Sequence, residues 1–266
     1  MIMEGKKGIV FGVSNKFGIA NAIAEQLYAE GADIAFTYAN EAMQGRVTPL
    51  AEAMNAKMIA ECDVTNEEHL ERTFKKYAEI YGKIDFMVHA VAFANREDLM
   101  GEFINTSKDG WNLAMGVSAY SLVAMCRHAR PYFNENASVL TLTYLGSEKM
   151  VPNYNVMGVA KAALEASSRY LASDLGKDGV RVNCLSAGAV KTLSAKGISG
   201  FDRMLKVNAL KAPLQRNVTL EDVGKTGLYL LSDMASGVTG EVLHVDCGCH
   251  SVYTSLQEIE MMTKNN

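Results

Sequence analysis

Residues 8–18 read GIVFGVSNKFG, and this stretch decides the fold. The short apolar run Gly8–Gly12 leads into a turn that ends at Gly18, and a segment of helical period begins at Ile19. Glycines at both ends of the turn permit a tight bend and let phosphate groups approach the N–H groups at a helix start. The turn is not a strict G-x-G-x-x-G motif, so by itself it could also be a simple strand-to-helix connection.

The alternation of short Val- and Ile-rich runs with longer helical segments continues along the chain. It is typical of a parallel sheet covered by helices on both faces. We therefore predict an α/β fold, a single-domain Rossmann fold with a doubly wound, parallel, seven-stranded sheet. The predicted strands are Gly8–Gly12, Asp33–Tyr38, Lys57–Cys62, Ile84–Ala90, Ser138–Thr143, Val180–Leu185 and Glu241–Val245. The predicted helices are Ile19–Glu30, Glu41–Met54, Glu67–Tyr81, Lys108–Ala129, Asn155–Leu175 and Leu220–Ser232, and we expect Thr65 and Thr219 to cap two of them.

No repeat, low-complexity stretch or linker divides the chain, which contains only four prolines. Residues 1–266 are therefore expected to form one dinucleotide-binding catalytic domain, although two domains would be possible at this length. Residues 191–218 interrupt the regular alternation before the last helix. We predict a helical substrate-binding flap there, over whatever binds at the strand ends.

The net charge of -4 and the pI near 5.8 argue against a protein that mainly binds nucleic acid. No apolar stretch approaches the length of a membrane span, and residues 1–7 lack the apolar core of a signal peptide, so we expect a cytoplasmic location. The five scattered cysteines are interpreted as reduced thiols. Cys247-Gly-Cys249-His250 could belong to a metal site, but it lacks a second pair at ligand spacing, which favours a structural role and no metal.

The ends of the second and third predicted strands bear on the cofactor. Asp63 could accept a hydrogen bond from an adenine amino group, or it could be an ordinary helix cap or turn residue. The stretch Tyr38-Ala39-Asn40-Glu41 carries no basic residue before Arg46. Because the 2′-phosphate of NADPH needs a nearby Arg or Lys, this favours NADH over NADPH.

Two tyrosines and a lysine are expected to meet at the carboxyl edge of the sheet. Tyr144 follows the fifth predicted strand, and the next helix opens with Tyr154 and reaches Lys161 two turns later. Residues seven apart on a helix return to within about 20° of the same face. A phenol can donate a hydrogen bond to oxygen as negative charge develops, and a cation can hold a ribose and assist the proton's departure. Taken singly, each could also be an ordinary helix residue on a solvated face.

The pattern resembles the signature of the enoyl-acyl-carrier-protein reductases, a divergent branch of the short-chain dehydrogenases. Tyr154 and Lys161 have the Tyr-x6-Lys spacing of that branch, and residues 152–166, PNYNVMGVAKAALEA, match the signature almost residue for residue. The similarity covers about residues 5 to 250. Other matching stretches are Gly12-Val13, Ala35–Tyr38, Gly45–Val47, Cys62–Val64, His89–Ala94, Val180–Asn183, Ser186–Gly188 and Gly240–Asp246.

The resemblance implies hydride transfer from NADH to the β-carbon of a trans-2-enoyl thioester in fatty-acid synthesis. Tyr154 would stabilise and protonate the enolate, Lys161 would hold the ribose, and Tyr144 would be the third catalytic residue. Tyr144, Tyr154 and Ala94 would contact the substrate. The implied cofactor contacts are Gly12, Gly18, Ile19, Ala39, Asp63, Val64, Val91, Lys161, Val190, Thr192 and Ser194. An acyl carrier protein or coenzyme A thioester and a homotetrameric assembly are also implied.

The predicted flap is basic within an acidic chain. It contains Lys191, Lys196, Arg203, Lys206, Lys211 and Arg216 against the single acid Asp202. Such a patch could steer an acidic carrier protein or the phosphates of coenzyme A, or it could be a solvated face. The apolar residues Phe201, Met204, Leu205, Val207 and Leu210 recur at helical spacing and could cover an acyl chain or simply pack.

Four positions depart from the family pattern: Gly18, Ala90, Ala189 and Cys247. They concern cofactor affinity and substrate identity more than the type of reaction. Two other interpretations remain at this point, because a fold alone does not determine chemistry. One is a specialised enoyl-CoA reductase or another short-chain reductase, although Tyr-x6-Lys speaks against ketone reduction. The other is a non-catalytic NAD-binding sensor, against which the intact Tyr154 and Lys161 argue.

Overall fold

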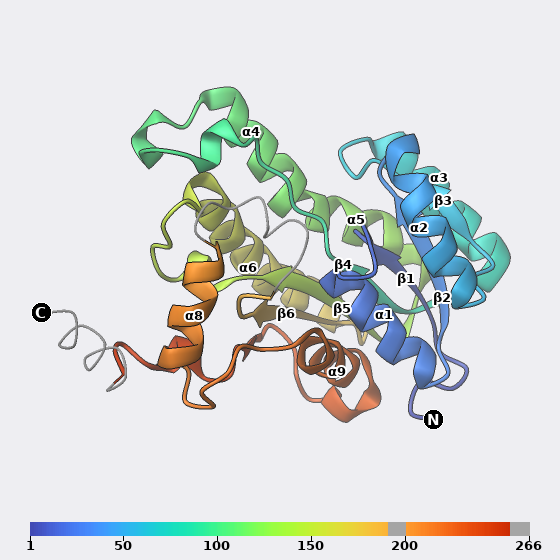
Figure 1. Ribbon diagram of the computed structural model, residues 1–266. Helices are drawn as coiled ribbons and strands as arrows, with labels where there is room; N and C mark the ends of the chain where they lie inside the picture. Colours follow the sequence, from blue (N-terminus) through green and yellow to red (C-terminus); the bar gives the residue numbers. More distant parts are fainter. Residues whose placement is uncertain (191–200, 256–266) are drawn as a thin grey trace, which may run out of the picture.

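The computed structural model describes residues 1–190 and 201–255. Seven parallel strands form one sheet in the order β3-β2-β1-β4-β5-β6-β7 (Figure 1). Their bounds are β1 (Lys7–Phe11), β2 (Asp33–Tyr38), β3 (Ile59–Glu61), β4 (Ile84–His89), β5 (Phe133–Thr143), β6 (Arg181–Ala187) and β7 (Val242–Val245). The predicted doubly wound, seven-stranded Rossmann sheet is confirmed. The strand order reverses between β1 and β4, and in such folds ligands bind in the crevice at this reversal.

Helices cover both faces of the sheet (Figure 1). On one face lie α1 (Ile19–Ala29), α2 (Glu41–Ala53) and α9 (Leu220–Leu231). On the other lie α3 (Glu67–Tyr81), α5 (Ser121–Ala129) and α6 (Asn155–Gly176), with α4 (Lys108–Met115) beside α6. Of the predicted flap, the structure describes residues 201–218, which contain α8 (Phe201–Lys211). Within the described ranges no helix is both long and apolar enough to cross a membrane.

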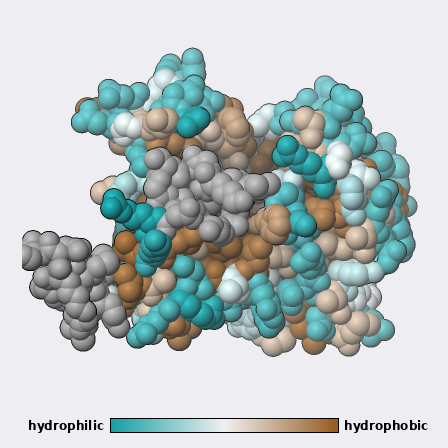
Figure 2. All heavy atoms as spheres, in the orientation of Figure 1, coloured by the Kyte–Doolittle hydropathy of each residue, from teal (hydrophilic) through white to brown (hydrophobic). Residues whose placement is uncertain are grey.

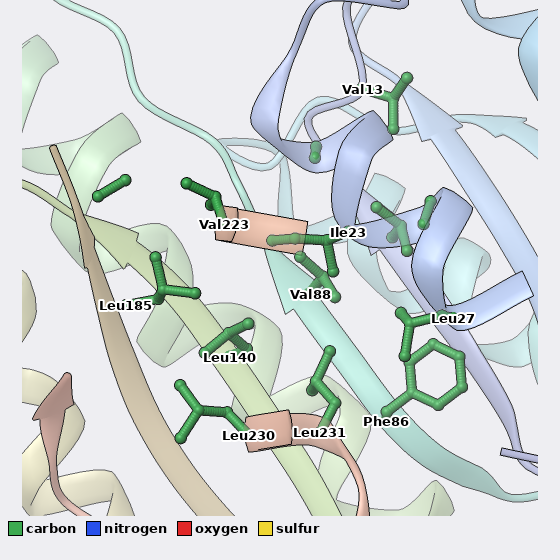
Figure 3. Packing of buried hydrophobic residues seen from close by; sticks show 14 of the residues in the cluster. Val13, Ile23, Leu27, Phe86, Val88, Leu140, Leu185, Val223, Leu230 and Leu231 are labelled. Carbon is green, nitrogen blue, oxygen red and sulfur yellow. The ribbon is translucent and has the colours of Figure 1, made fainter. Parts of the chain in front are cut away.

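The sheet separates two hydrophobic cores. Neighbouring residues of β1 belong to different cores, Val10 to the one under α1 and α9 and Ile9 to the one under α3, α5 and α6. Figure 3 shows the first core, where side chains from the central strands, such as Val88 and Leu140, meet Ile23 of α1 and Leu230 of α9. Burying each such side chain stabilises the folded state by roughly 1.5–3 kcal/mol. Packing in the two cores therefore fixes the positions of the strands relative to one another.

Some element boundaries differ from the predictions. β5 begins at Phe133 rather than at Ser138, and β3 is confined to Ile59–Glu61. Thr219 caps α9 as predicted, with a reciprocal bond to Asp222. The prediction that Thr65 caps α3 is wrong, because the Asn66 side chain accepts the bonds from the first N–H groups of the helix. The Thr65 hydroxyl donates instead to Asp63 at 2.8 Å.

The single helix predicted over Lys108–Ala129 is interrupted by a π-helical turn, Gly116–Tyr120, between α4 and α5. The turn places the Ser118 hydroxyl against the backbone of Phe93, which donates to it at 2.9 Å and accepts from it at 3.1 Å. Phe93 lies in the segment that follows β4. The π-helical turn therefore fixes a loop at the edge where the strand order reverses, which is a common location for such turns.

Candidate active site

A cavity of about 480 Å³ lies at the carboxyl edge of the sheet. Segments that follow β1, β4, β5 and β6 form its walls, and Met204 of α8 closes one side. Its lining residues are Ile19, Ala90, Ala92, Phe93, Ala94, Leu99, Thr143, Tyr144, Val151, Pro152, Asn153, Tyr154, Met157, Ala187, Gly188, Ala189, Val190 and Met204. The structure thus brings together five residues predicted to bind ligands, namely Ile19, Ala94, Tyr144, Tyr154 and Val190.

The cavity is largely apolar, and it adjoins a more polar one. Figure 2 shows hydrophobic residues gathered across the middle of one face, with hydrophilic residues above and below them. A second cavity of about 240 Å³ shares Tyr144 and Met204 with the first and is also lined by Lys149, Lys211 and Arg216. Asp246 also lines the second cavity and Arg216 is paired with Asp222 at 2.6 Å, so Lys149 and Lys211 supply the positive charge that can attract an anionic ligand.

The two tyrosines form an edge-to-face pair. Tyr144 directly follows β5 and Tyr154 directly precedes α6, and their ring centroids lie 5.0 Å apart with the planes at 73°. Gly146 leaves the space for this arrangement, because a Cβ atom there would lie 2.4 Å from Cδ1 of Tyr154. Burial raises the pKa of the Tyr154 phenol above its usual value. The phenol therefore stays protonated at neutral pH and can donate a hydrogen bond or a proton.

The backbone on either side of Tyr154 is left-handed. Asn153 has φ 62° and Asn155 has φ 39°, a region in which asparagine is the most tolerant residue after glycine. The Asn155 side chain donates to the carbonyl oxygen of Gly101 at 3.2 Å. The position of the Tyr154 ring is therefore set by the chain path at the start of α6.

Lys161 lies inside the protein, two turns after Tyr154. Only 6% of its surface is exposed, and its Nζ donates to the carbonyl oxygen of Leu142 at 2.7 Å. The alternative of a solvated surface lysine is therefore wrong. Burial lowers the pKa of Lys161 to about 8, against the opposing influence of Cys184 and Glu165. An ammonium has three N–H bonds, so two remain to hold another group.

The residues predicted to bind the cofactor follow the sheet edge in order. Asp63 and Val64 follow β3, Ala39 follows β2, Gly12, Gly18 and Ile19 follow β1, Val91 follows β4, and Val190 follows β6. Neighbouring strands are about 4.8 Å apart, so this row can hold an extended dinucleotide with its adenine near β3 and its nicotinamide near β5. Two further predicted contacts, Thr192 and Ser194, lie outside the described residues.

The turn between β1 and α1 fits a pyrophosphate. Gly18 is the N-cap of α1 and offers no side-chain bond to the first N–H groups, whereas side chains cap α2, α3, α4 and α9. Those N–H groups can bind phosphate oxygens. Gly12 has φ 92°, and a Cβ atom there would lie 2.1 Å from the Ala90 carbonyl oxygen, so no other residue fits this path. The residues present therefore suit a dinucleotide.

No basic side chain directly follows β2, near the place where the adenosine of a dinucleotide would lie. Ala39 has no polar side chain, and Arg46 is exposed on α2. The Asp63 carboxylate accepts hydrogen bonds from the backbone N–H and the hydroxyl of Thr65 at 2.9 and 2.8 Å. Asp63 therefore acts as a turn residue, which is the alternative that the sequence left open. These bonds use one carboxylate oxygen, and the other can still accept a hydrogen bond from an adenine.

Several site residues were not singled out from the sequence. Thr143 and Met157 line the cavity, and His89 lies fully buried beneath it between the hydroxyls of Thr141 and Ser121, at 2.7 and 2.8 Å. Burial lowers the pKa of His89 to about 3, so the ring is neutral. The spacing of Met157 three residues after Tyr154 is a sequence signal that could have found it.

The cysteines of the C-terminal segment are buried, and Cys247, where the family pattern has glycine, adopts a left-handed φ of 60°. In residues 1–190 and 201–255, no group of three or more His, Cys, Asp or Glu side chains is arranged to hold a metal ion. His250 instead pairs with Asp246 at 2.9 Å.

Known proteins resemble this chain in both sequence and structure. The family model "Enoyl-(Acyl carrier protein) reductase" matches residues 12–250. The chain is 51% identical over 251 residues to the NADH enoyl-[acyl-carrier-protein] reductase 1 of Rhizobium meliloti, covering 94% of this chain and 92% of the relative. It is 51% identical over 250 residues to the NADH enzyme FabI of Bacillus subtilis, covering 93% and 97%. The crystal structure of the Anaplasma phagocytophilum reductase in complex with NAD superposes with a TM-score of 0.93 at 49% identity, covering 96% of this chain and 98% of that one.

Proposed function

The chain belongs to the enoyl-(acyl carrier protein) reductase family, and from that premise we propose that it reduces trans-2-enoyl thioesters with NADH during fatty-acid synthesis. The observation that carries the proposal is the half-buried pair Tyr144 and Tyr154 lining an apolar cavity, with the buried Lys161 two turns further along α6. A protonated phenol and a buried ammonium at this spacing suit the reduction of a carbon–carbon double bond next to a carbonyl.

NADH would lie along the sheet edge, with its pyrophosphate at the start of α1 and its nicotinamide in the cavity. Gly12, Gly18, Ile19, Ala39, Asp63, Val64, Val91, Val190, Thr192 and Ser194 are the residues we assign to it. When bound, it supplies the hydride that reaches the β-carbon of the enoyl group. Two N–H bonds of Lys161 are available for the ribose hydroxyls, since the third is donated to Leu142.

Tyr154 provides the hydrogen bond that stabilises the developing enolate oxygen. Its phenol holds its proton strongly, because burial raises its pKa, and this suits a group that donates a hydrogen bond before it gives up a proton. Tyr144 faces it edge-on and forms the wall that orients the thioester carbonyl. Ala94 also lines the cavity, where a small side chain leaves room for the acyl chain.

We propose an acyl carrier protein thioester as the natural substrate. The acidic carrier would approach over the second cavity, where Lys149 and Lys211 supply positive charge. Comparing rates on carrier-protein and coenzyme A thioesters of the same acyl group separates this from a specialised enoyl-CoA reductase. We place the enzyme in the cytoplasm as a homotetramer, for which light scattering should give a mass four times 28.9 kDa.

The first experiment is to follow NADH absorbance with a trans-2-enoyl thioester. Replacing Lys161 by Ala or Tyr154 by Phe should lower kcat/KM by about 100-fold or more, because each removes a group that contacts the reacting system. Tyr170→Phe is a matched control on α6, since Tyr170 is 78% exposed, and it should keep the original rate. NADPH should be used poorly.

Absence of turnover with every enoyl thioester, despite measurable NADH binding, would contradict the proposal and favour an NAD-binding sensor. Turnover of ketones in place of enoyl thioesters would favour another short-chain reductase.

A further inference from the structure

A second charged side chain is buried beside Lys161. Glu165 follows Lys161 by one turn of α6, and only 7% of its surface is exposed. The Thr143 hydroxyl donates to its Oε1 at 2.5 Å, just as Lys161 donates to the carbonyl oxygen of Leu142. The two charged residues are thus attached to consecutive residues of β5, immediately before Tyr144.

The other ionisable groups around the pair come from three elements. They are His89 on β4, Cys184 on β6, and Tyr154 and Arg169 on α6. Burial keeps His89 neutral, raises the pKa of Cys184 to about 12 and raises that of Tyr154, so none of these three is charged at neutral pH. Arg169 acts on Cys184. Among these groups, the Glu165 carboxylate is the only one that can balance the ammonium.

We propose that Glu165 is a positioning residue whose carboxylate, held by Thr143, favours the charged form of Lys161, the form that can hold the cofactor ribose. This rests on the proposed role of Lys161. A carboxylate one turn away on a helix lies on the same face as the ammonium, and in a site shielded from water its attraction is stronger than at a surface. Without it, Cys184, whose thiol is neutral at this pH, is the remaining group opposing burial, and burial then favours the neutral amine more strongly.

The proposal is tested first on the cofactor-free chain. We would label lysine side chains with ¹³C, assign the Lys161 signal by its loss in Lys161→Arg, and titrate it by NMR. Glu165→Gln keeps the shape and can still accept from Thr143 but removes the charge, so the titration midpoint of Lys161 should fall by about one pH unit. Asp174→Asn removes the same charge from an exposed position on α6 and should leave the midpoint unchanged.

A second variant covers the case in which Glu165→Gln does not fold. Thr143→Val keeps the carboxylate but removes the hydrogen bond that holds it, so the midpoint should fall by a smaller amount. An unchanged midpoint in Glu165→Gln, or in Thr143→Val if only that variant folds, would overturn the proposal.

NADH affinity gives an independent measurement. At pH 6.5 Lys161 is protonated in both chains, so Glu165→Gln should bind NADH as tightly as the original protein. Near pH 8.5 the variant should bind several-fold more weakly, because it loses the ammonium at a lower pH. Equal weakening at both pH values would show a general structural defect and overturn the assigned role. A shifted NMR midpoint without any change in NADH affinity would uphold the Glu165–Lys161 coupling and reject the proposed contact with the ribose instead.

Discussion

The ring of Tyr154 depends on a residue that has no side chain. Gly146 faces both tyrosine rings, and a Cβ atom there would overlap the Tyr154 ring. We predict that Gly146→Ala displaces the phenol and lowers kcat by about 10- to 100-fold, because displacements of roughly 1 Å have effects of this size. Gly176→Ala is the control, since nothing lies within 4 Å of a Cβ there. An unchanged kcat in Gly146→Ala would show that the ring position is not limiting.

The spacing of residues in the sequence identified candidate site residues, but it did not show which side chains are buried. Tyr154 and Lys161 were selected by their seven-residue spacing at the start of α6, after the strand end that carries Tyr144. Glu165 was not singled out, because an acid on a helix is ordinarily solvated and only the packing of α6 against β5 buries it. His89 was not recognised as a buried residue for the same reason.

Between elements, the π-helical turn Gly116–Tyr120 holds the loop after β4. The Ser118 hydroxyl makes both of its bonds to the Phe93 backbone. We predict that Ser118→Ala lowers the free energy of unfolding by about 1–2 kcal/mol, because the buried hydroxyl loses two hydrogen bonds to part-buried backbone groups. It should also raise KM for the enoyl substrate, since Phe93 and Ala94 line the cavity.

Chemical denaturation and steady-state kinetics check the two effects of Ser118→Ala. Ser173→Ala, at an exposed position on α6, is the matched control. If KM stays unchanged while stability falls, the turn would support the fold without shaping the substrate cavity.

The elements themselves were well predicted, because parallel strands buried on both faces produce continuous apolar runs. All seven strands were found, although β5 begins five residues before the predicted Ser138 and β3 is shorter than predicted. The π-helical turn was missed, since no proline within residues 108–129 marks a break in the predicted helix. The cap of α3 was assigned to Thr65 because Thr65 and Asn66 are both good caps, and only the backbone path selects Asn66.

For the molecule as a whole, the burial of His89 predicts sensitivity to acid. Its pKa is about 3 in the folded chain and about 6.5 when unfolded, so the unfolded chain takes up the proton first as the pH falls. The stabilisation is complete above about pH 6.5 and is lost toward pH 3, by at most about 1.4 kcal/mol per pH unit. His89→Gln can retain hydrogen bonds to Thr141 and Ser121, and it should flatten the dependence of unfolding free energy on pH in this window. An identical slope in both proteins would contradict a buried neutral histidine.

The row of proposed cofactor-binding positions along the sheet edge has a consequence for how activity would be acquired during folding. The adenine side is built from β1, β2 and β3, and the tyrosine pair from the chain after β5. A partly folded chain with only the first half of the sheet would have a nucleotide-binding surface without a reaction centre. During refolding, recovery of NADH binding should therefore precede recovery of turnover, and the delay between them would time the docking of the second half.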